Sequence, residues 1–160
     1  SGVAFHGAFR FLNMNIPRGS IILSAFVTFI VAVTRTGTVV NTNLSLEDVD
    51  NAAQIVSNAD FDGRALTAVV AWDGIPAWTG GDSKDTPSLV TPFQTVINRA
   101  GWSNNNAVNI FWKDDDSSAS AYRQVASWDH LTYTEPVLTI TWTAPSPSSV
   151  VPLAMGAGIV

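Results

Sequence analysis

Short runs of alternating or β-branched residues, separated by polar turns, recur along almost the whole chain. Each run has the length of one strand in a globular protein, and Gly, Pro, Asn, Asp and Ser mark the turns between runs. The pattern predicts strands over residues 4–11, 21–34, 39–46, 66–72, 107–113, 122–127 and 137–142. The fold class that follows is all-β, an antiparallel β-sandwich or barrel.

Some of these runs carry more specific expectations. Residues 21–34 are apolar on both faces for part of their length, which is typical of a central strand buried on two sides. Residues 107–113 and 122–127 are expected to form a hairpin around the Asp-rich turn between them. The last run is expected to turn its apolar side chains inward, namely Leu138, Ile140 and Trp142.

One segment has the spacing of a helix. Its apolar residues are Leu89, Val90, Phe93, Val96 and Ile97. Thr86 or Thr91 suits the N-cap, and Gly101 suits the position just past the C-terminus. Because Pro92 interrupts any longer helix, we expect a short one near residues 92–99.

The composition argues against several classes of protein. Hydrophobic residues make up 46% and charged residues 13% of the chain, a balance that opposes intrinsic disorder. The eight basic residues are scattered and form no basic stripe, so nucleic acid is not an expected partner. The chain has no cysteine, which excludes disulfides and thiolate metal sites. No apolar run is long enough for a membrane helix, and Ser1 indicates a processed precursor or a piece of a longer chain.

Several motifs resemble a family of jelly-roll modules found in bacterial secreted and surface proteins and in phage structural proteins. These modules are similar to carbohydrate-binding modules. The segments that carry the resemblance are Glu47–Ala52, Trp78–Asp82, Thr86–Leu89, Gln94–Trp102, Asn106–Val108 and Pro136–Ile140. Ser88 stands where the family usually has Asp, and Asn105 where it usually has Gly. The resemblance implies a jelly-roll sandwich over residues 1–142 and a structural or binding role.

The start of the chain departs from the family pattern. Family members usually carry another strand or two before the position of Phe9, whereas eight residues precede it here. A sandwich that lacks such a strand is expected to have a hydrophobic groove and unpaired backbone groups at one edge.

The end of the chain carries a segment that could fill such a groove. Residues 143–149 form a Pro/Ser linker, and residues 150–160 form an apolar strand. Small or compact residues occupy one face of this strand, and the other face holds Val151, Leu153, Met155, Ala157 and Ile159. Left in water, a segment of this kind would aggregate, so we expect it to be paired.

Two pairings are open for this segment. It can return as the last strand of its own sandwich, or it can be donated to a neighbouring subunit by strand addition. Repeated donation from each subunit to the next gives an open filament. A membrane anchor is excluded by length.

Catalytic groups are sparse. His6 and His130 are far apart in sequence, and Glu47 and Glu135 are expected to be isolated surface groups. No Ser lies in a nucleophile motif, so we do not expect an enzyme or a cofactor.

Acidic turns raise the alternative of a calcium site. The candidate ligands are Asp60, Asp62, Asp114 and Asp116. The competing interpretation is that each Asp only stabilises its own turn, and we favour it. Asn43 begins an N-glycosylation sequon, which matters only in a secreted protein.

The tryptophans raise the alternative of glycan binding, since flat aromatic faces stack on sugar rings. Trp72, Trp112 and Trp142 lie in predicted strands and are assigned to the core. Trp128, with Tyr122 and Tyr133 nearby in sequence, is the best candidate for an exposed ligand platform.

The sequence therefore predicts a structural subunit of an extracellular, cell-surface or virion assembly, a homo-oligomer that forms a fibre through its C-terminal strand. The first alternative is a carbohydrate-binding module with glycans as partners. The second is a phage capsid-decorating or tail-associated protein whose C-terminal strand docks on another chain.

Overall fold

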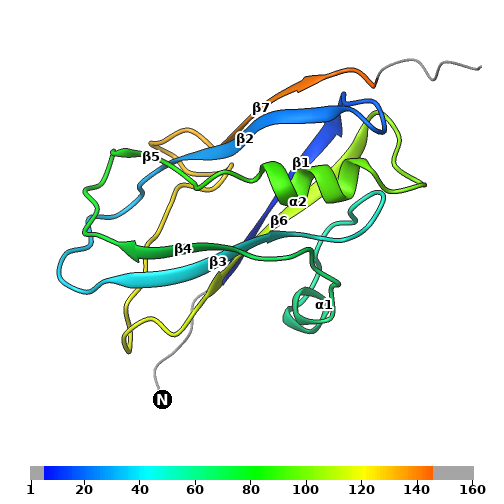
Figure 1. The fold of residues 1–160 in the computed structure, drawn as a ribbon. Coiled ribbons are helices and arrows are strands. Elements are labelled where there is room, and N and C mark those ends of the chain that lie inside the picture. The colour runs from blue at the N-terminus through cyan, green and yellow to red at the C-terminus, as the bar shows by residue number, and fades with distance from the viewer. Residues whose placement is uncertain (1–5, 146–160) are drawn as a thin grey trace, which may run out of the picture.

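Two antiparallel sheets form the body of the protein, as a computed structural model of residues 6–145 shows. The strands are β1 (Gly7–Met14), β2 (Ile21–Ile30), β3 (Val40–Leu46), β4 (Val70–Ile75), β5 (Ser83–Asp85), β6 (Asn106–Asp114) and β7 (Val137–Thr143), and the helices are α1 (Asn58–Asp62) and α2 (Val90–Ile97). One sheet has the order β1–β6–β3–β4 and the other β5–β2–β7 (Figure 1). The predicted β-sandwich is confirmed, and its jelly-roll topology stays a prediction.

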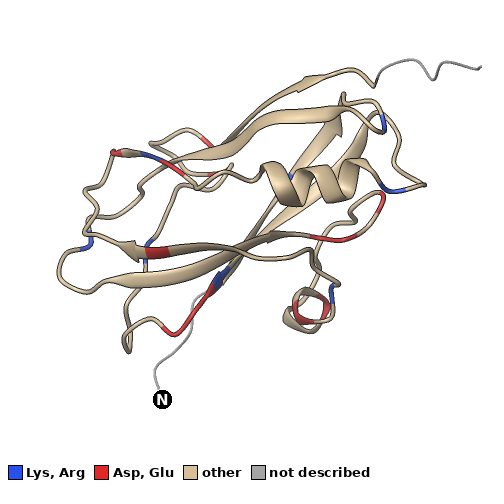
Figure 2. Ribbon diagram, viewed as in Figure 1, with Lys and Arg blue, Asp and Glu red and all other residues tan. Residues whose placement is uncertain are grey.

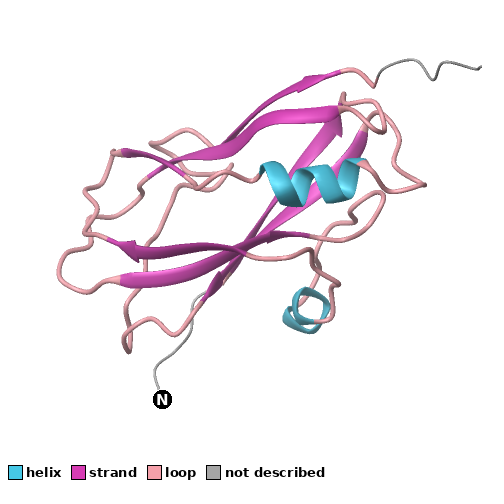
Figure 3. Cartoon of the chain, viewed as in Figure 1, coloured by secondary structure: helices cyan, strands magenta, loops and turns pink. Residues whose placement is uncertain are grey.

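The core lies between the two sheets and is built by strand alternation. In β2, Ala25, Val27 and Phe29 point inward and are almost fully buried. In β7, Leu138 and Ile140 pack on the core as predicted. Since side chains alternate across a strand, the intervening residues face out, and Figure 3 shows that no helix covers the outer face of β2 and β7.

The helix α2 closes one side of the sandwich, where it contacts β2 and β3 (Figure 1). Its existence was predicted, but it begins at Val90 and its N-cap is Leu89 without a side-chain hydrogen bond. The predicted cap is wrong because Thr86 instead accepts a hydrogen bond from the Val27 N–H at 3.1 Å. Pro92 is tolerated inside the first turn, where backbone N–H groups have no partner in the helix.

The predicted hairpin between residues 107–113 and 122–127 is wrong. The second segment pairs with the end of β2 instead, through a bridge between Val125 and Val31. Two backbone bonds continue this pairing, from the Ala32 N–H to the Gln124 carbonyl at 2.9 Å and from the Ala126 N–H to the Ile30 carbonyl at 2.8 Å. Alternation marks both segments as extended, but it does not say which strand each one joins.

Three further expectations are corrected. The strand predicted over residues 21–34 ends at Ile30, and although it is central in its sheet, Ile21 and Leu23 on its outer face are more than half exposed. The strand predicted over residues 66–72 is shifted to Val70–Ile75. The helix α1 was not predicted at all.

The turn before β6 has a left-handed backbone. Asn105 in this turn has a φ of 68°. Asn is one of the few side chains that adopt this conformation readily, so the turn before β6 is kept without glycine.

Neither helix in residues 6–145 is long and apolar enough to cross a membrane.

Candidate functional site

A groove runs along the free edge of β1. This strand pairs with β6 on one side, from Gly7 opposite Trp112 to Met14 opposite Asn106, and among residues 6–145 it is the last strand of its sheet. The groove has a volume of about 1230 Å³, and all six residues from Gly7 to Leu12 line it. A run of consecutive lining residues means that the groove follows the strand edge itself, where backbone N–H and C=O groups point away from β6.

Two walls flank this edge. The outer wall consists of Gln54, Ile55, Ser57, Asn58, Phe61 and Asp62, from α1 and the segment before it. The inner wall consists of Ser127, Trp128, Glu135 and Pro136, from the connection that leads into β7. We call this space the β1 groove. Its two walls lie beside opposite faces of β1.

The inward face of β1 is apolar and only partly covered. Phe9 and Phe11 are half-buried, and the Phe9 ring lies 4.9 Å from the ring of Phe29 in β2. On the outward face, Arg10 donates to the Ala52 carbonyl through Nε at 3.1 Å and Nη2 at 2.8 Å. This side chain ties the edge strand to the segment that leads into the outer wall.

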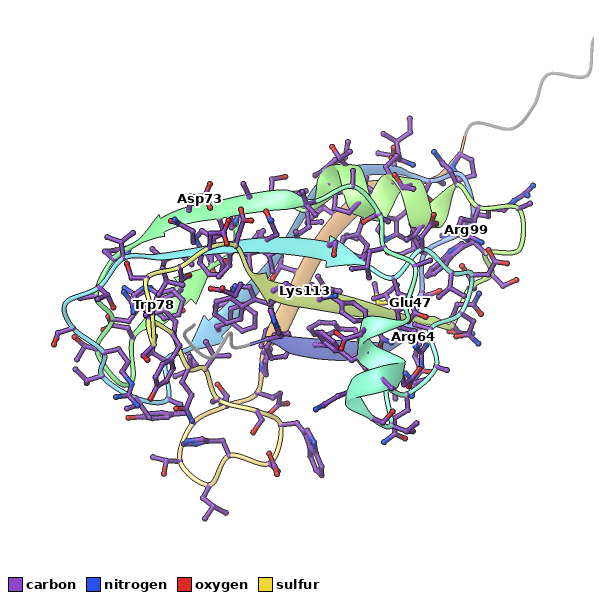
Figure 4. All side chains as sticks on the ribbon, turned by 90° about the horizontal axis from the view of Figure 1, so that it is seen from below. Glu47, Arg64, Asp73, Trp78, Arg99 and Lys113 are labelled. Atoms are coloured by element: carbon purple, nitrogen blue, oxygen red, sulfur yellow. The ribbon has the colours of Figure 1, made fainter. Side chains whose placement is uncertain are left out.

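A partly buried ion-pair network holds the outer wall. Arg64 binds Glu47 and Asp60, in each case with a shortest distance of 2.7 Å, and Glu47 accepts a further bond of 2.7 Å from Asn109 of β6. Figure 4 shows Glu47 and Arg64 side by side next to α1. The hydrogen bond from Arg64 is the main cause that lowers the pKa of Asp60, and the bond to Asp60 is the main cause that raises the pKa of Arg64.

This network corrects the expectation that Glu47 is an isolated surface group, since it is only 6% exposed. The sequence contained one signal for the network. Ser57 precedes Asp60 by three residues, and its hydroxyl caps α1 by accepting the Asp60 N–H at 3.1 Å. The Asp60 carboxylate in turn accepts the Val56 N–H at 3.0 Å, so the pair resembles a capping box.

A second arginine fixes the start of the same segment. Arg99, just after α2, binds Asp48 at 2.5 Å and Asp50 at 2.7 Å. Gly101 lies against the Asp50 carboxylate. The glycine serves this close approach, and the helix ends earlier, at Ile97 with Asn98 as its C-cap. The expectation that Gly101 ends the helix is therefore wrong.

Packing against aromatic rings completes the outer wall. Phe61 of α1 lies 4.8 Å from the ring of Phe111 on the outer face of β6. The ammonium group of Lys113 lies 4.8 Å from the centre of the Phe61 ring. These contacts seat α1 on the sheet beside β1.

A smaller hollow adjoins the start of β1. It has a volume of about 420 Å³ and shares His6, Gly7 and Phe9 with the β1 groove. Val40 of β3 and Val125 also line it. The two spaces therefore meet at the first residues of β1.

The three aromatic residues of the predicted platform lie in different surroundings. Trp128 is 84% exposed at the rim of the β1 groove. Tyr122 lies under the guanidinium of Arg35, and Tyr133 stacks on His130 with ring centres 5.2 Å apart. Trp128 thus has the exposure that a platform needs.

The predicted calcium ligands are engaged or dispersed. Asp60 is bound by Arg64, and Asp116 lies in a turn with a φ of 55°. Asp62 lines the β1 groove, and Asp114 donates its backbone N–H to His6 Nδ1 at 3.1 Å. Within residues 6–145 no three acidic or histidine side chains are grouped to hold a metal ion. Elsewhere, Asn43, the predicted glycosylation site, is half-buried in β3.

The remaining titratable candidates contact the backbone or line the groove. His130 Nδ1 accepts the N–H groups of Thr132 and Tyr133. Glu135 lines the inner wall of the β1 groove.

The predicted assembly strand lies outside the described residues, as does most of the linker. Its residues are Val151, Leu153, Met155, Ala157 and Ile159.

No protein-family model matches this chain, and no curated protein matches it either.

Proposed function

We propose that this chain is a non-enzymatic structural subunit of an extracellular or virion-surface assembly. Each subunit donates its C-terminal strand, residues 150–160, to the next subunit and accepts a strand from the previous one. Such a contact joins two different surfaces, so it propagates head to tail into a fibre. The resemblance to jelly-roll modules of surface and phage proteins supports this class of role.

One observation carries the proposal: in the described part of the chain β1 pairs only with β6, and its other edge lines the β1 groove. Edge strands of soluble proteins are usually short, charged, bulged or covered, because an open edge pairs with other chains. The pairing of β1 with β6 shifts register between Phe11 and Met14, but it is regular from Gly7 to Phe11, where Arg10 is the one charged side chain and is turned onto Ala52. The edge is therefore suited to strand addition.

Deleting residues 149–160 tests the proposal. We expect the wild-type chain to form fibres or large oligomers in electron micrographs and the truncated chain to be a monomer by light scattering. In the full-length chain, Leu153→Asp with Met155→Asp should have the same effect, and Ser148→Asp with Ser149→Asp in the linker is the control. Unchanged assembly of both the truncated and the doubly substituted chain would exclude strand donation.

A carbohydrate-binding module is the second candidate, and the exposure of Trp128 at the groove rim favours it. Carboxylates of Glu135 and Asp62 line the same groove and could accept hydrogen bonds from sugar hydroxyls. A glycan array on the full-length chain tests this, with loss of binding in Trp128→Ala as the expected result. Leu131→Ala is the matched control, because Leu131 is also fully exposed in the same connection.

A further inference from the structure

We propose that the β1 groove is the acceptor for the C-terminal strand of a neighbouring copy. The strand lies antiparallel to β1, with Val151, Leu153, Met155, Ala157 and Ile159 toward the sandwich interior. This inference rests on the proposed function and adds to it the acceptor edge, the direction and the facing of the donated strand.

The backbone of β1 offers the hydrogen bonds. Among residues 6–145, β6 is the one strand that pairs with β1. Every strand pair in both sheets is antiparallel, and antiparallel pairing is slightly more stable per residue than parallel pairing. A strand added outside β1 in the antiparallel sense continues the pattern of its sheet.

The lengths of the two strands agree. The eight residues of β1 span about 27 Å at the rise of an antiparallel strand. Residues 150–160, if extended, span about 37 Å at the same rise, enough to follow β1 along its whole length. The surplus of roughly 10 Å at that rise can reach the adjoining hollow, which begins at His6 and Gly7.

The two faces of the donated strand suit the two walls of the groove. Its larger side chains would lie beside Phe9 and Phe11, whose rings are half-buried because no strand of the described part covers them on that side. Its other face contains Ala154, Gly156 and Gly158, and these would lie beneath the outer wall.

The outer wall bounds the groove at this face. Gln54, Ile55 and Phe61 line the groove there, and the Arg64 and Arg10 bonds hold the segment in place. A shift of register by one residue would turn the large side chains toward this wall, so only shifts by two are compatible with the proposal.

The path of the chain favours a neighbouring copy as the donor. A Cβ placed on Gly19 would lie 3.9 Å from Pro145, so β7 delivers the chain to the end of the sandwich where β1 stops. To reach its own β1 edge, the chain would have to reverse within a few residues. Pro145 keeps Ala144 before it out of the helical region, so the chain leaves β7 in an extended direction.

Cysteine cross-linking tests the proposal, because the natural chain contains no cysteine. Ala8→Cys, on the outward face of β1, is co-expressed with a second, separately tagged chain that carries a cysteine at Ala154, Gly156 or Gly158. Residues directly opposite each other on antiparallel strands are within the Cα separation that a disulfide requires. We expect a disulfide-linked dimer of the two tagged chains for at least one of these positions.

Two controls match the substitution. Ala157→Cys lies on the opposite face of the donated strand and should give no dimer with Ala8→Cys. Ala71→Cys lies on β4, the other edge of the same sheet, and should give no dimer with any tail cysteine. Dimers with Ala157→Cys as strong as those with its neighbours would overturn the facing, and dimers through Ala71→Cys would overturn the acceptor edge.

The outcomes separate this inference from the proposed function. If assembly depends on residues 149–160 but none of the three tail cysteines cross-links to Ala8→Cys, the acceptor is wrong and strand donation stands. If one chain that carries both cysteines forms only an internal disulfide and stays a monomer, the strand completes its own sheet. That result would overturn both proposals.

Discussion

Phe29 of β2 and Trp112 of β6 stack across the interior with ring centres 5.4 Å apart and planes at 11°. They belong to different sheets, so this contact joins the two layers directly. Phe29 also lies 4.9 Å from Phe9 and 6.5 Å from Trp72, and it is completely buried. The cluster ties the edge strand β1 to the centre of the core.

Phe29→Ala should therefore destabilise the fold strongly. Removing a fully buried Phe from a packed core lowers the free energy of unfolding by about 3–5 kcal/mol. Urea denaturation followed by tryptophan fluorescence measures this change. Phe26→Ala on the same strand is the control, because Phe26 faces outward and is only half-buried. Equal losses in the two variants would contradict the central role of the Phe29 cluster.

Alternation made several elements of this fold predictable from the sequence. The alternating apolar residues of β7 and the helical spacing of α2 are local signals, and both elements form where these signals lie. The pairing of residues 122–127 with β2 could not be predicted, since hydrogen-bond partners depend on contacts between distant segments. The exposed outer face of β2 was missed because apolar residues such as Leu23 also occur on open sheet faces.

The candidate site was predictable only in outline. An uncovered edge was expected from the resemblance to jelly-roll modules and stays a prediction, and within residues 6–145 a groove lies along β1. The arginines that build the outer wall were missed, because no local pattern indicates that Arg10, Arg64 and Arg99 converge on one segment. Figure 2 shows how sparse charge is on the strands, and β2 and β7 carry none. Because charged residues are so sparse, each of these three arginines could have been expected to have a specific binding partner, even though the residues next to it in sequence do not indicate which one.

Gly101→Ala should weaken the attachment of the outer wall. An added Cβ would collide with the Asp50 carboxylate, which is held by Arg99 at 2.7 Å. We expect a loss of about 1 kcal/mol in the free energy of unfolding, typical of a local rearrangement. Gly7→Ala is the matched control, because no atom lies within 4 Å of a Cβ built there. Thermal denaturation of both variants measures the difference, and an equal effect of the two would contradict this role of Gly101.

The Arg64 network should make the protein sensitive to acid. The pKa of Asp60 in the folded state is lowered from 3.8, so the native state binds this proton less readily than the unfolded chain. The resulting stabilisation is present above about pH 4 and is lost as the pH falls through the folded-state value. Asp60→Asn should therefore reduce the dependence of stability on pH below 4. Urea denaturation across this range measures the effect, with Asp73→Asn on β4 as the control. An unchanged pH profile in Asp60→Asn would exclude this contribution.

Arg123 should contribute most to holding residues 122–127, the segment that pairs with the end of β2, against the sandwich. It is 8% exposed, and its guanidinium donates to the carbonyls of Thr38, Ile75, Pro76 and Tyr122 at 2.6–3.0 Å. The fork thus joins the segment to one end of the β3–β4 pair, where β3 begins and β4 ends, and burial lowers the pKa of the Arg123 guanidinium from 12.5. Arg123→Met keeps most of the volume but leaves these buried carbonyls unpaired.

The expected loss in Arg123→Met is about 2–4 kcal/mol in the free energy of unfolding. The rate of hydrogen exchange should rise first at the amides of Ala121 and Ala126. These amides donate hydrogen bonds to the carbonyls of Ser118 and Ile30 at the two ends of the segment. Arg123→Lys should recover little of this lost stability. A single ammonium group cannot reach all the carbonyls that the planar guanidinium of arginine binds at once. Arg18→Met is the control, since Arg18 makes an exposed bond to Ala100 and should change stability by about 0.5 kcal/mol or less. If exchange rose uniformly across the sheets instead, Arg123 would stabilise the whole sandwich and not this segment in particular.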